Sequence, residues 1–362
     1  MSAFGKSPLP AAFNRLATNR KAVRPTVTLA RIGRTVLGFF IVLAVVSLVS
    51  LSIGPGDITP ASLMRGLFAG PDAAGSGLGA ADRIILFNLR LPRICIAAVV
   101  GAGLSASGVI FQAILRNPLA DPYILGISGG AAVGAILGIM LGAAAIPMGV
   151  SAFAFLGAIL TVLLLFGTAG SRQAQSSHSL LLTGVIINAF FSAIIMFLLS
   201  VSKSDRLQSI LYWLMGDLSS AEGGDIVMTG VILFIGFLVM MAYARTLNLL
   251  VAGDETAAQL GVEVPKNRKI LLITASTVTA AAVCVSGTVG FVGLIIPHIL
   301  RLWVGPDHRL LLPVAILFGA AFLVMADTVA RTVLSPVELP VGVVTALCGA
   351  PFFFYLLRVR GT

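Results

Sequence analysis

The chain has 362 residues, of which 58% are hydrophobic and only 10% are charged. A soluble domain carries about 25% charged residues, so a water-soluble fold is excluded and lipid must be the solvent for much of this surface. The formal net charge is +10, but the basic residues gather in the first 34 residues and beside apolar runs. That distribution is typical of membrane proteins and argues against nucleic-acid binding. The sequence therefore predicts an all-α, polytopic membrane protein.

Ten apolar segments approach the length of about 20 residues that an α-helix needs to cross a bilayer. In chain order, the predicted spans are residues 35–53, 91–113, 124–145, 150–169, 180–200, 227–246, 270–286, 291–304, 311–330 and 340–358. Pro297 is expected to kink the eighth span, and the amphipathic segment 208–216 is expected to lie at the interface. These segments divide the chain into a basic tail at 1–34, a transmembrane domain at 35–358 and a C-terminal end at 359–362.

The distribution of positive charge predicts the orientation of the spans. An even number of spans returns both termini to the same side of the membrane. In this arrangement most of the 24 Lys and Arg residues fall on that side, which the positive-inside rule assigns to the cytoplasm. We therefore expect a multi-pass protein of the cell inner (plasma) membrane, in contact with membrane lipid, with cytoplasmic N- and C-termini.

The sequence carries no arrangement of residues that is typical of an enzyme. Its three His and three Cys residues are not spaced as metal ligands. Gly5-Lys6-Ser7 resembles the end of a phosphate-binding loop, but it lacks the first glycine of that motif and no strand is expected before it. We therefore expect no catalysis, no metal site and no ATP hydrolysis by this chain.

One acid, Asp327, lies inside a predicted span, and Arg331 follows four residues later on the same helix face. Ion-coupled secondary transporters place ionisable residues inside their spans, so this pair leaves that function open as an alternative. A structural ion pair near the outer end of the helix explains the same two residues. One acid is thin support for ion coupling, so energy for transport is expected from a partner protein.

The segment 247–269 forms the largest internal loop on the predicted cytoplasmic side. Asp254 is expected to be the N-cap of a short helix, with Glu255 in its first turn and Gly261 just beyond its end. Such a helix can sit in a groove on a partner and transmit motion as a rigid body. The alternative is a loop that only connects two spans.

Several sequence blocks occur together in an order that is specific to one family. They are Arg90–Arg93, Gly108–Gln112, Arg116–Pro122, Leu125–Ala131, Tyr212–Gly216, Gly253–Gly261, Gly290–Arg301 and Glu338–Thr345. From about residue 34 to 358, the chain resembles the permease subunits of binding-protein-dependent ABC importers for iron–siderophore, haem and cobalamin. The resemblance implies a type II ABC importer permease architecture. It also implies a second permease copy (identical or paralogous), two ABC ATPase subunits and a periplasmic substrate-binding protein as partners.

The resemblance also implies roles for individual residues. The ATPases are expected to bind Gly253, Asp254, Glu255, Ala257, Ala258, Leu260 and Gly261. The binding protein is expected to dock on Arg90, Arg93 and Arg331, and the cytoplasmic gate is expected at Asn117, Leu119, Ser177 and His178. The alternatives are interfacial anchoring for Arg90 and Arg93, pairing with Asp327 for Arg331, and simple turn initiation for Asn117-Pro118.

Together, these features predict a non-catalytic permease that moves an iron(III)–siderophore from the periplasm to the cytoplasm by alternating access. Cobalamin and haem are the related chelates that the same sequence blocks serve. The resemblance implies that this chain binds no cofactor, whereas ATP and Mg are expected on the partner ATPases.

Overall fold

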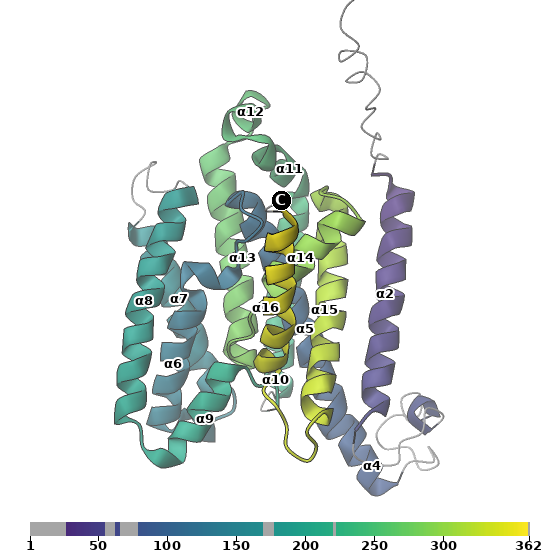
Figure 1. Ribbon diagram of the computed structural model, residues 1–362, viewed down its shortest axis with the longest axis vertical. Helices are drawn as coiled ribbons and strands as arrows, with labels where there is room; N and C mark the ends of the chain where they lie inside the picture. The colour runs from purple at the N-terminus through teal and green to yellow at the C-terminus, as the bar shows by residue number, and fades with distance from the viewer. Residues whose placement is uncertain (1–26, 55–61, 66–78, 169–176, 220–221, 361–362) are drawn as a thin grey trace, which may run out of the picture.

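The computed structural model describes residues 27–54, 62–65, 79–168, 177–219 and 222–360, which form a bundle of helices without a strand among them (Figure 1). Seven helices in these residues are long and apolar enough to cross a membrane. They are α2 (Leu29–Ser52), α5 (Leu91–Ile114) with its extension from Ala80, α7 (Gly149–Thr168), α8 (Ser177–Val201), α10 (Gly223–Ala242), α13 (Val264–Ser286) and α15 (His308–Thr332). Three further helices have shorter apolar stretches: α6 (Ile127–Leu141), α14 (Val292–Trp303) and α16 (Val341–Arg360), whose apolar stretch is Val341–Phe354.

Each predicted span overlaps one of these apolar helices, so the predicted all-α polytopic architecture is confirmed. The bounds differ where the sequence pattern is interrupted. The second span begins earlier, because α4 (Ala80–Ile84) and the π-helix η1 (Ile85–Arg90) continue into α5. The third is shorter, because a 3₁₀ turn precedes α6 and the left-handed residues Gly126 (φ 85°) and Gly142 (φ 82°) flank it. Glycine adopts that backbone conformation without steric cost, which explains why the helix begins and ends there.

Helix α5 is buried in the centre of the bundle and packs against α13, α14 and α15. Two of these crossings bring backbones into direct contact through glycine. A Cβ added to Gly101 would lie 2.3 Å from the carbonyl oxygen of Gly319, and one added to Gly108 would lie 2.0 Å from that of Gly293. Small residues allow such close helix packing in membranes. The Gln112 amide adds hydrogen bonds to the carbonyl oxygens of Gly293 and Leu294, at 3.2 and 3.1 Å.

Figure 1 shows how the connecting helices divide between the two ends of the bundle. One end carries α11 (Ala244–Ala252) and α12 (Asp254–Gln259), together with the start of α2 and the end of α16. We call it the α12 end. The opposite end carries α4 and the amphipathic α9 (Ser204–Met215), and we call it the α9 end. The ends of the described chain therefore lie on one side, as an even number of crossings requires, and α9 does not cross the bundle.

The outer helices expose apolar side chains along their length. Phe40 on α2, Leu156 on α7, Phe190 and Phe197 on α8 and Phe234 on α10 are all more than half exposed. An exposed apolar surface of this extent is unfavourable in water but suits the hydrocarbon core of a bilayer. These helices therefore form the lipid-facing side of the bundle.

Candidate functional site

The predicted coupling segment forms a six-residue helix, α12, at the α12 end of the bundle (Figure 1). Ala257 is fully buried and holds α12 against the bundle, whereas Glu255, Ala258, Leu260 and Gly261 are exposed. The exposed residues share the outer side of the segment, where a partner protein can reach them. Gly253 (φ 136°) and Gly261 (φ 83°) flank the helix in conformations that favour glycine.

The prediction that Asp254 is the N-cap of this helix is wrong. The N-cap is Gly253, which makes no side-chain cap, and Asp254 is the first helical residue. The Asp254 carboxylate instead accepts hydrogen bonds from Arg268 on α13, at 2.9 and 3.0 Å, and from Arg116 at the end of α5. Charge-assisted bonds to two guanidinium groups are stronger than a neutral cap, which explains the position of this carboxylate.

Arg116 joins the coupling segment to the predicted gate. Its guanidinium also donates two hydrogen bonds to the carbonyl oxygen of Leu250, at 3.0 and 2.7 Å, so it holds the end of α11 and the start of α12 together. Its backbone lies in the left-handed region, with φ of 48°. For a residue other than glycine this conformation costs free energy, which the surrounding contacts must offset. Arg116 is therefore held tightly where α5 ends and the turn at Asn117 and Leu119, the predicted gate, begins.

The turn that contains the predicted gate residues Asn117 and Leu119 follows directly. The Asn117 side-chain oxygen accepts a hydrogen bond from the backbone N–H of Leu119 at 2.9 Å, and the Asn117 carbonyl accepts one from Ala120 at 3.0 Å. This is the local turn that Asn-Pro favours. Leu119 is 42% exposed. Ser177 and His178 begin α8, but their side chains lie outside the described part of the chain, so the second half of the predicted gate is not placed by this structure.

The three predicted docking arginines gather at the α9 end. They line one cavity of about 400 Å³, together with Pro336 and Glu338. Arg93 forms ion pairs with Asp327, at 3.0 Å, and with Glu338, at 2.5 Å. Arg331 lies 3.9 Å from the same Asp327 carboxylate. The predicted Asp327–Arg331 contact therefore exists, but the closer partner of Asp327 is Arg93.

Two of these arginines are buried and bind the end of α2. Arg90, which is 4% exposed, donates a hydrogen bond to the Leu51 carbonyl at 2.6 Å. Arg331 donates to the carbonyl of Ser50 and, at 2.8 Å, to its hydroxyl. Asp327 is 1% exposed. A carboxylate this deeply buried needs paired cations, and Arg93 and Arg331 supply them.

A second ion-pair cluster lies at the α12 end, beside α11. Asp307 caps α15 and accepts hydrogen bonds from the guanidinium of Arg309 and from the amide of Asn248 at 3.0 Å. These donors hold the pKa of the Asp307 carboxyl well below its ordinary value. The side-chain oxygen Oδ1 of Asn248 accepts a hydrogen bond from the backbone N–H of His308 at 3.0 Å. The cluster therefore fixes α11, and through it α12, to the start of α15.

The sequence pattern of the FecCD transport family matches residues 42–359, which is most of the chain. The chain belongs to the FecCD transport family. It is 46% identical over 284 residues to the cobalamin import system permease protein BtuC of Halobacterium salinarum, covering 78% of this chain and 76% of that protein. It is 36% identical over 330 residues to the iron(3+)-hydroxamate import system permease protein FhuG of Bacillus subtilis, covering 88% and 94%.

A solved structure gives the same assignment. The inward-facing conformation of a metal-chelate type ABC transporter superposes with a TM-score of 0.78 at 32% identity, covering 90% of this chain and 99% of that one. This FecCD protein is therefore an ABC importer permease with the fold that the sequence predicts. The resemblance that the sequence blocks indicate is confirmed.

Sequence reasoning missed the ion pairs that hold the predicted site residues in place. Arg116 and Arg268 are 138 and 14 residues from Asp254 in sequence, and Arg93 is 234 residues from Asp327. None of these pairs shares a helix, so no helical spacing could indicate them. Within the part of the chain that the structure describes, no group of three or more His, Cys, Asp and Glu residues is placed to hold a metal ion.

Proposed function

We propose that this FecCD protein is the permease subunit of an ABC importer that carries an iron(III)–siderophore, or a related chelate such as cobalamin or haem, from periplasm to cytoplasm. Movement is by alternating access and is driven by separate ATPase subunits. The observation that carries the proposal is the exposed helix α12, whose first residue, Asp254, binds Arg116 beside the gate turn. A passive connecting loop has no need of this ion pair between the predicted coupling and gating segments.

Energy enters at α12 in this proposal. The ATPases bind the exposed side of the segment, through Glu255, Ala258 and Leu260, while the buried Ala257 anchors it. ATP and Mg are held by the ATPases, and this chain binds no cofactor and catalyses no reaction. When α12 moves, the Asp254–Arg116 pair carries that displacement to the turn at Asn117 and Leu119. Ser177 and His178 form the opposite side of the same gate.

The periplasmic binding protein docks at the α9 end, on the cavity lined by Arg90, Arg93 and Arg331. Glu338 is 49% exposed, whereas Asp327 is buried. We propose that an acidic side chain of the binding protein replaces Glu338 on Arg93, while Asp327 stays in place. Exposed charges of opposite sign steer encounter, so docking weakens as salt concentration rises.

The passage itself is shared with a second permease copy, either identical or paralogous, across a face of the bundle. The alternative function, an ion-coupled secondary transporter that uses Asp327 and Arg331, is less well supported. Asp327 contacts two arginines, Arg93 and Arg331. A carboxylate neutralised in this way is poorly suited to take up and release a proton during transport.

Co-purification of the ATPase with the permease tests the coupling surface. We expect the parent chain to retain its ATPase in detergent. The Leu260→Asp variant, which places a charge on the exposed side of α12, should lose the ATPase. Lys266→Ala is the matched control, because Lys266 is exposed beyond α12 and pairs only with Glu263 at 3.4 Å among the described residues. Retention of the ATPase by Leu260→Asp would contradict the proposed coupling surface.

A further inference from the structure

A second cavity, of about 410 Å³, lies at the α9 end between the α6–α7 connection, α9, α10 and the end of α13. It is separate from the arginine cavity, because the described residues that line the two differ. Three acids face it: Asp217, Glu222 and Asp225. The described lining contains no Lys, Arg or His. The cavity therefore carries negative charge that its own lining does not compensate.

Asp225 is the decisive residue. It is 3% exposed, and its carboxylate oxygen Oδ1 is buried without a hydrogen-bond partner among the described residues. The other oxygen, Oδ2, accepts a hydrogen bond from the backbone N–H of Glu222 at 3.0 Å, in the capping box that begins α10. A buried carboxylate oxygen without a donor costs free energy, so this atom points to a ligand that supplies a positive donor.

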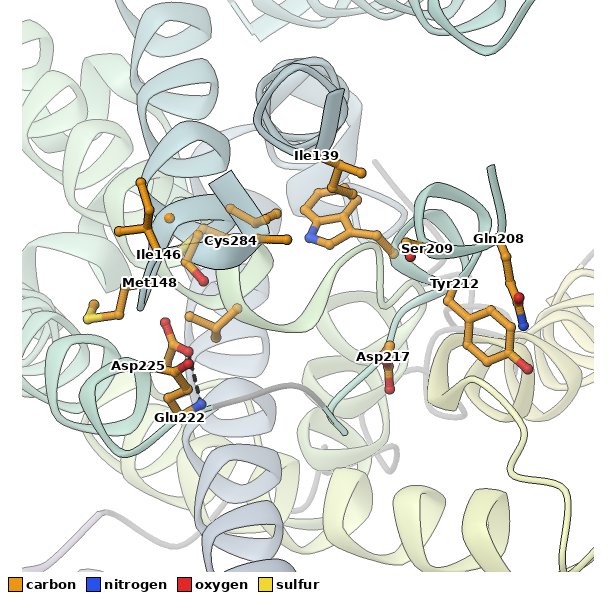
Figure 2. Close-up of a pocket in the computed structure, with 16 residues that line it drawn as sticks. Ile139, Ile146, Met148, Gln208, Ser209, Tyr212, Asp217, Glu222, Asp225 and Cys284 are labelled. Atoms are coloured by element: carbon orange, nitrogen blue, oxygen red, sulfur yellow. Dashed lines mark hydrogen bonds between the residues drawn. The ribbon is translucent and has the colours of Figure 1, made fainter. Parts of the chain in front are cut away.

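Among the residues that the structure describes, the hydrogen-bond donors to the other two acids are also neutral. Asp217 accepts hydrogen bonds from the backbone N–H and the hydroxyl of Ser219, both at 2.8 Å, and the Glu222 side chain accepts the backbone N–H that completes the capping box. Figure 2 shows Asp225 and Glu222 together on one side of the cavity, with Tyr212 on α9 at the other side and Asp217 nearer to it. Asp225 and Asp217 therefore lie on different sides of the space, and only Glu222 of the three acids is exposed.

Apolar and aromatic side chains make up much of the remaining lining, among them Ile139, Ile146, Met148, Tyr212 and Trp213, and the uncharged polar residues Ser151, Gln208 and Ser209 complete it. Aromatic faces attract organic cations, and apolar side chains favour the hydrocarbon part of such a ligand. A bare metal ion does not fit this chemistry, since no described group of acids, His and Cys is close enough to hold one. We propose that this cavity binds a small organic cation, with a protonated amine on Asp225 and its hydrocarbon portion against Trp213 and Met148.

Fluorescence of Trp213 tests the proposal on the purified chain alone. The chain has two tryptophans, and Trp303 lies at the end of α14, away from this cavity. The Trp303→Phe variant therefore leaves Trp213 as the only tryptophan reporter. We expect n-butylammonium to give a saturable change and n-butanol, its neutral analogue, to give none. Equal responses to the two molecules, or no saturable response to n-butylammonium, would overturn the proposal without any further variant.

Asp225→Asn in the same background identifies the carboxylate. Asparagine keeps the side-chain oxygen that accepts the capping hydrogen bond at the start of α10 but removes the charge. Because the charge-assisted hydrogen bond to the ammonium group is lost, binding of n-butylammonium should weaken about tenfold or more. Asp205→Asn on α9 is the matched control, because Asp205 lies outside the described lining, and we expect it to bind n-butylammonium as the parent does. Unchanged affinity in Asp225→Asn would contradict the assignment.

The natural amine can belong to the transported solute or to a Lys side chain of the periplasmic binding protein. Adding the binding protein at saturation distinguishes them. Displacement of n-butylammonium assigns the amine to the binding protein, and undisturbed binding assigns it to the solute. Only this last comparison rests on the proposed function, so failure of the transport proposal and failure of the cation site are separable.

Discussion

The guanidinium of Arg116 bonds the carboxylate of Asp254, although 138 residues separate them in sequence. Asp254 is the first residue of the exposed helix α12, and Arg116 immediately precedes the turn at Asn117. Arg268 on α13 holds the same carboxylate from a second direction. The Asp254 carboxylate therefore links the start of α12 directly to the end of α5 and to α13.

Arg116→Ala should uncouple transport from ATP hydrolysis. The pair is partly exposed, so its loss should change thermal stability by less than about 1 kcal/mol. Coupling through such a contact is expected to change transport per ATP hydrolysed roughly tenfold. The measurement is uptake and ATP hydrolysis in the same proteoliposomes. The losses caused by Arg116→Ala and Asp254→Ala should add up to more than the loss in the double variant, because the contact that the two residues share is removed only once, although Asp254→Ala also removes the contact with Arg268. Additive losses would show that they act separately.

Arg93→Ala should destabilise the fold strongly. It removes the closer cation from Asp327, which is 1% exposed, and breaking a buried ion pair costs about 3–5 kcal/mol. Thermal unfolding in detergent measures the effect. Glu338→Gln is the control on the same arginine, because Glu338 is half exposed and its loss should cost no more than about 1 kcal/mol. Equal effects of the two substitutions would contradict the structural role of Asp327.

Gly108→Ala should also destabilise the bundle. The added Cβ would lie 2.0 Å from the Gly293 carbonyl oxygen, so α5 and α14 would have to separate at a cost of about 1–3 kcal/mol. Gly230→Ala on α10 is the control, because nothing lies within 4 Å of its added Cβ. That substitution should be neutral or stabilise α10 by up to about 1 kcal/mol. A stable, closely packed Gly108→Ala protein would disprove the direct backbone contact.

Asp121 should make stability depend on pH. It follows the turn at Asn117 and Leu119, and its carboxylate accepts a hydrogen bond from the backbone N–H of Tyr123 at 2.8 Å. Burial raises the pKa of this carboxyl to about 6. The folded protein therefore binds a proton more tightly than the unfolded chain, so stability falls as pH rises from about 4 to 6. Asp121→Asn should remove this part of the pH dependence of the melting temperature. An unchanged slope would contradict the raised pKa.

The sequence predicts the spans well because a bilayer requires long apolar runs, and each run marks one helix. It also predicts α12, because glycines flank a short run of helix-forming residues. It does not predict where Asp254 and Asp327 point, since their closest partners, Arg116, Arg268 and Arg93, lie on other helices. Nor does the sequence indicate that Asp225 has an unpartnered carboxylate oxygen, because an acid at a helix N-terminus is ordinarily a cap. Its unpartnered oxygen becomes visible only once α10 and α13 are placed together.

Uptake of a ferric siderophore by proteoliposomes that contain the permease, its ATPase and external binding protein tests the central claim most directly. The account predicts uptake that requires ATP on the ATPase side and stops when the ATPase is omitted, with no response to a proton or sodium gradient. Cobalamin and haem, offered with their binding proteins, identify the chelate. Uptake that persists without the ATPase and follows an ion gradient would contradict the account.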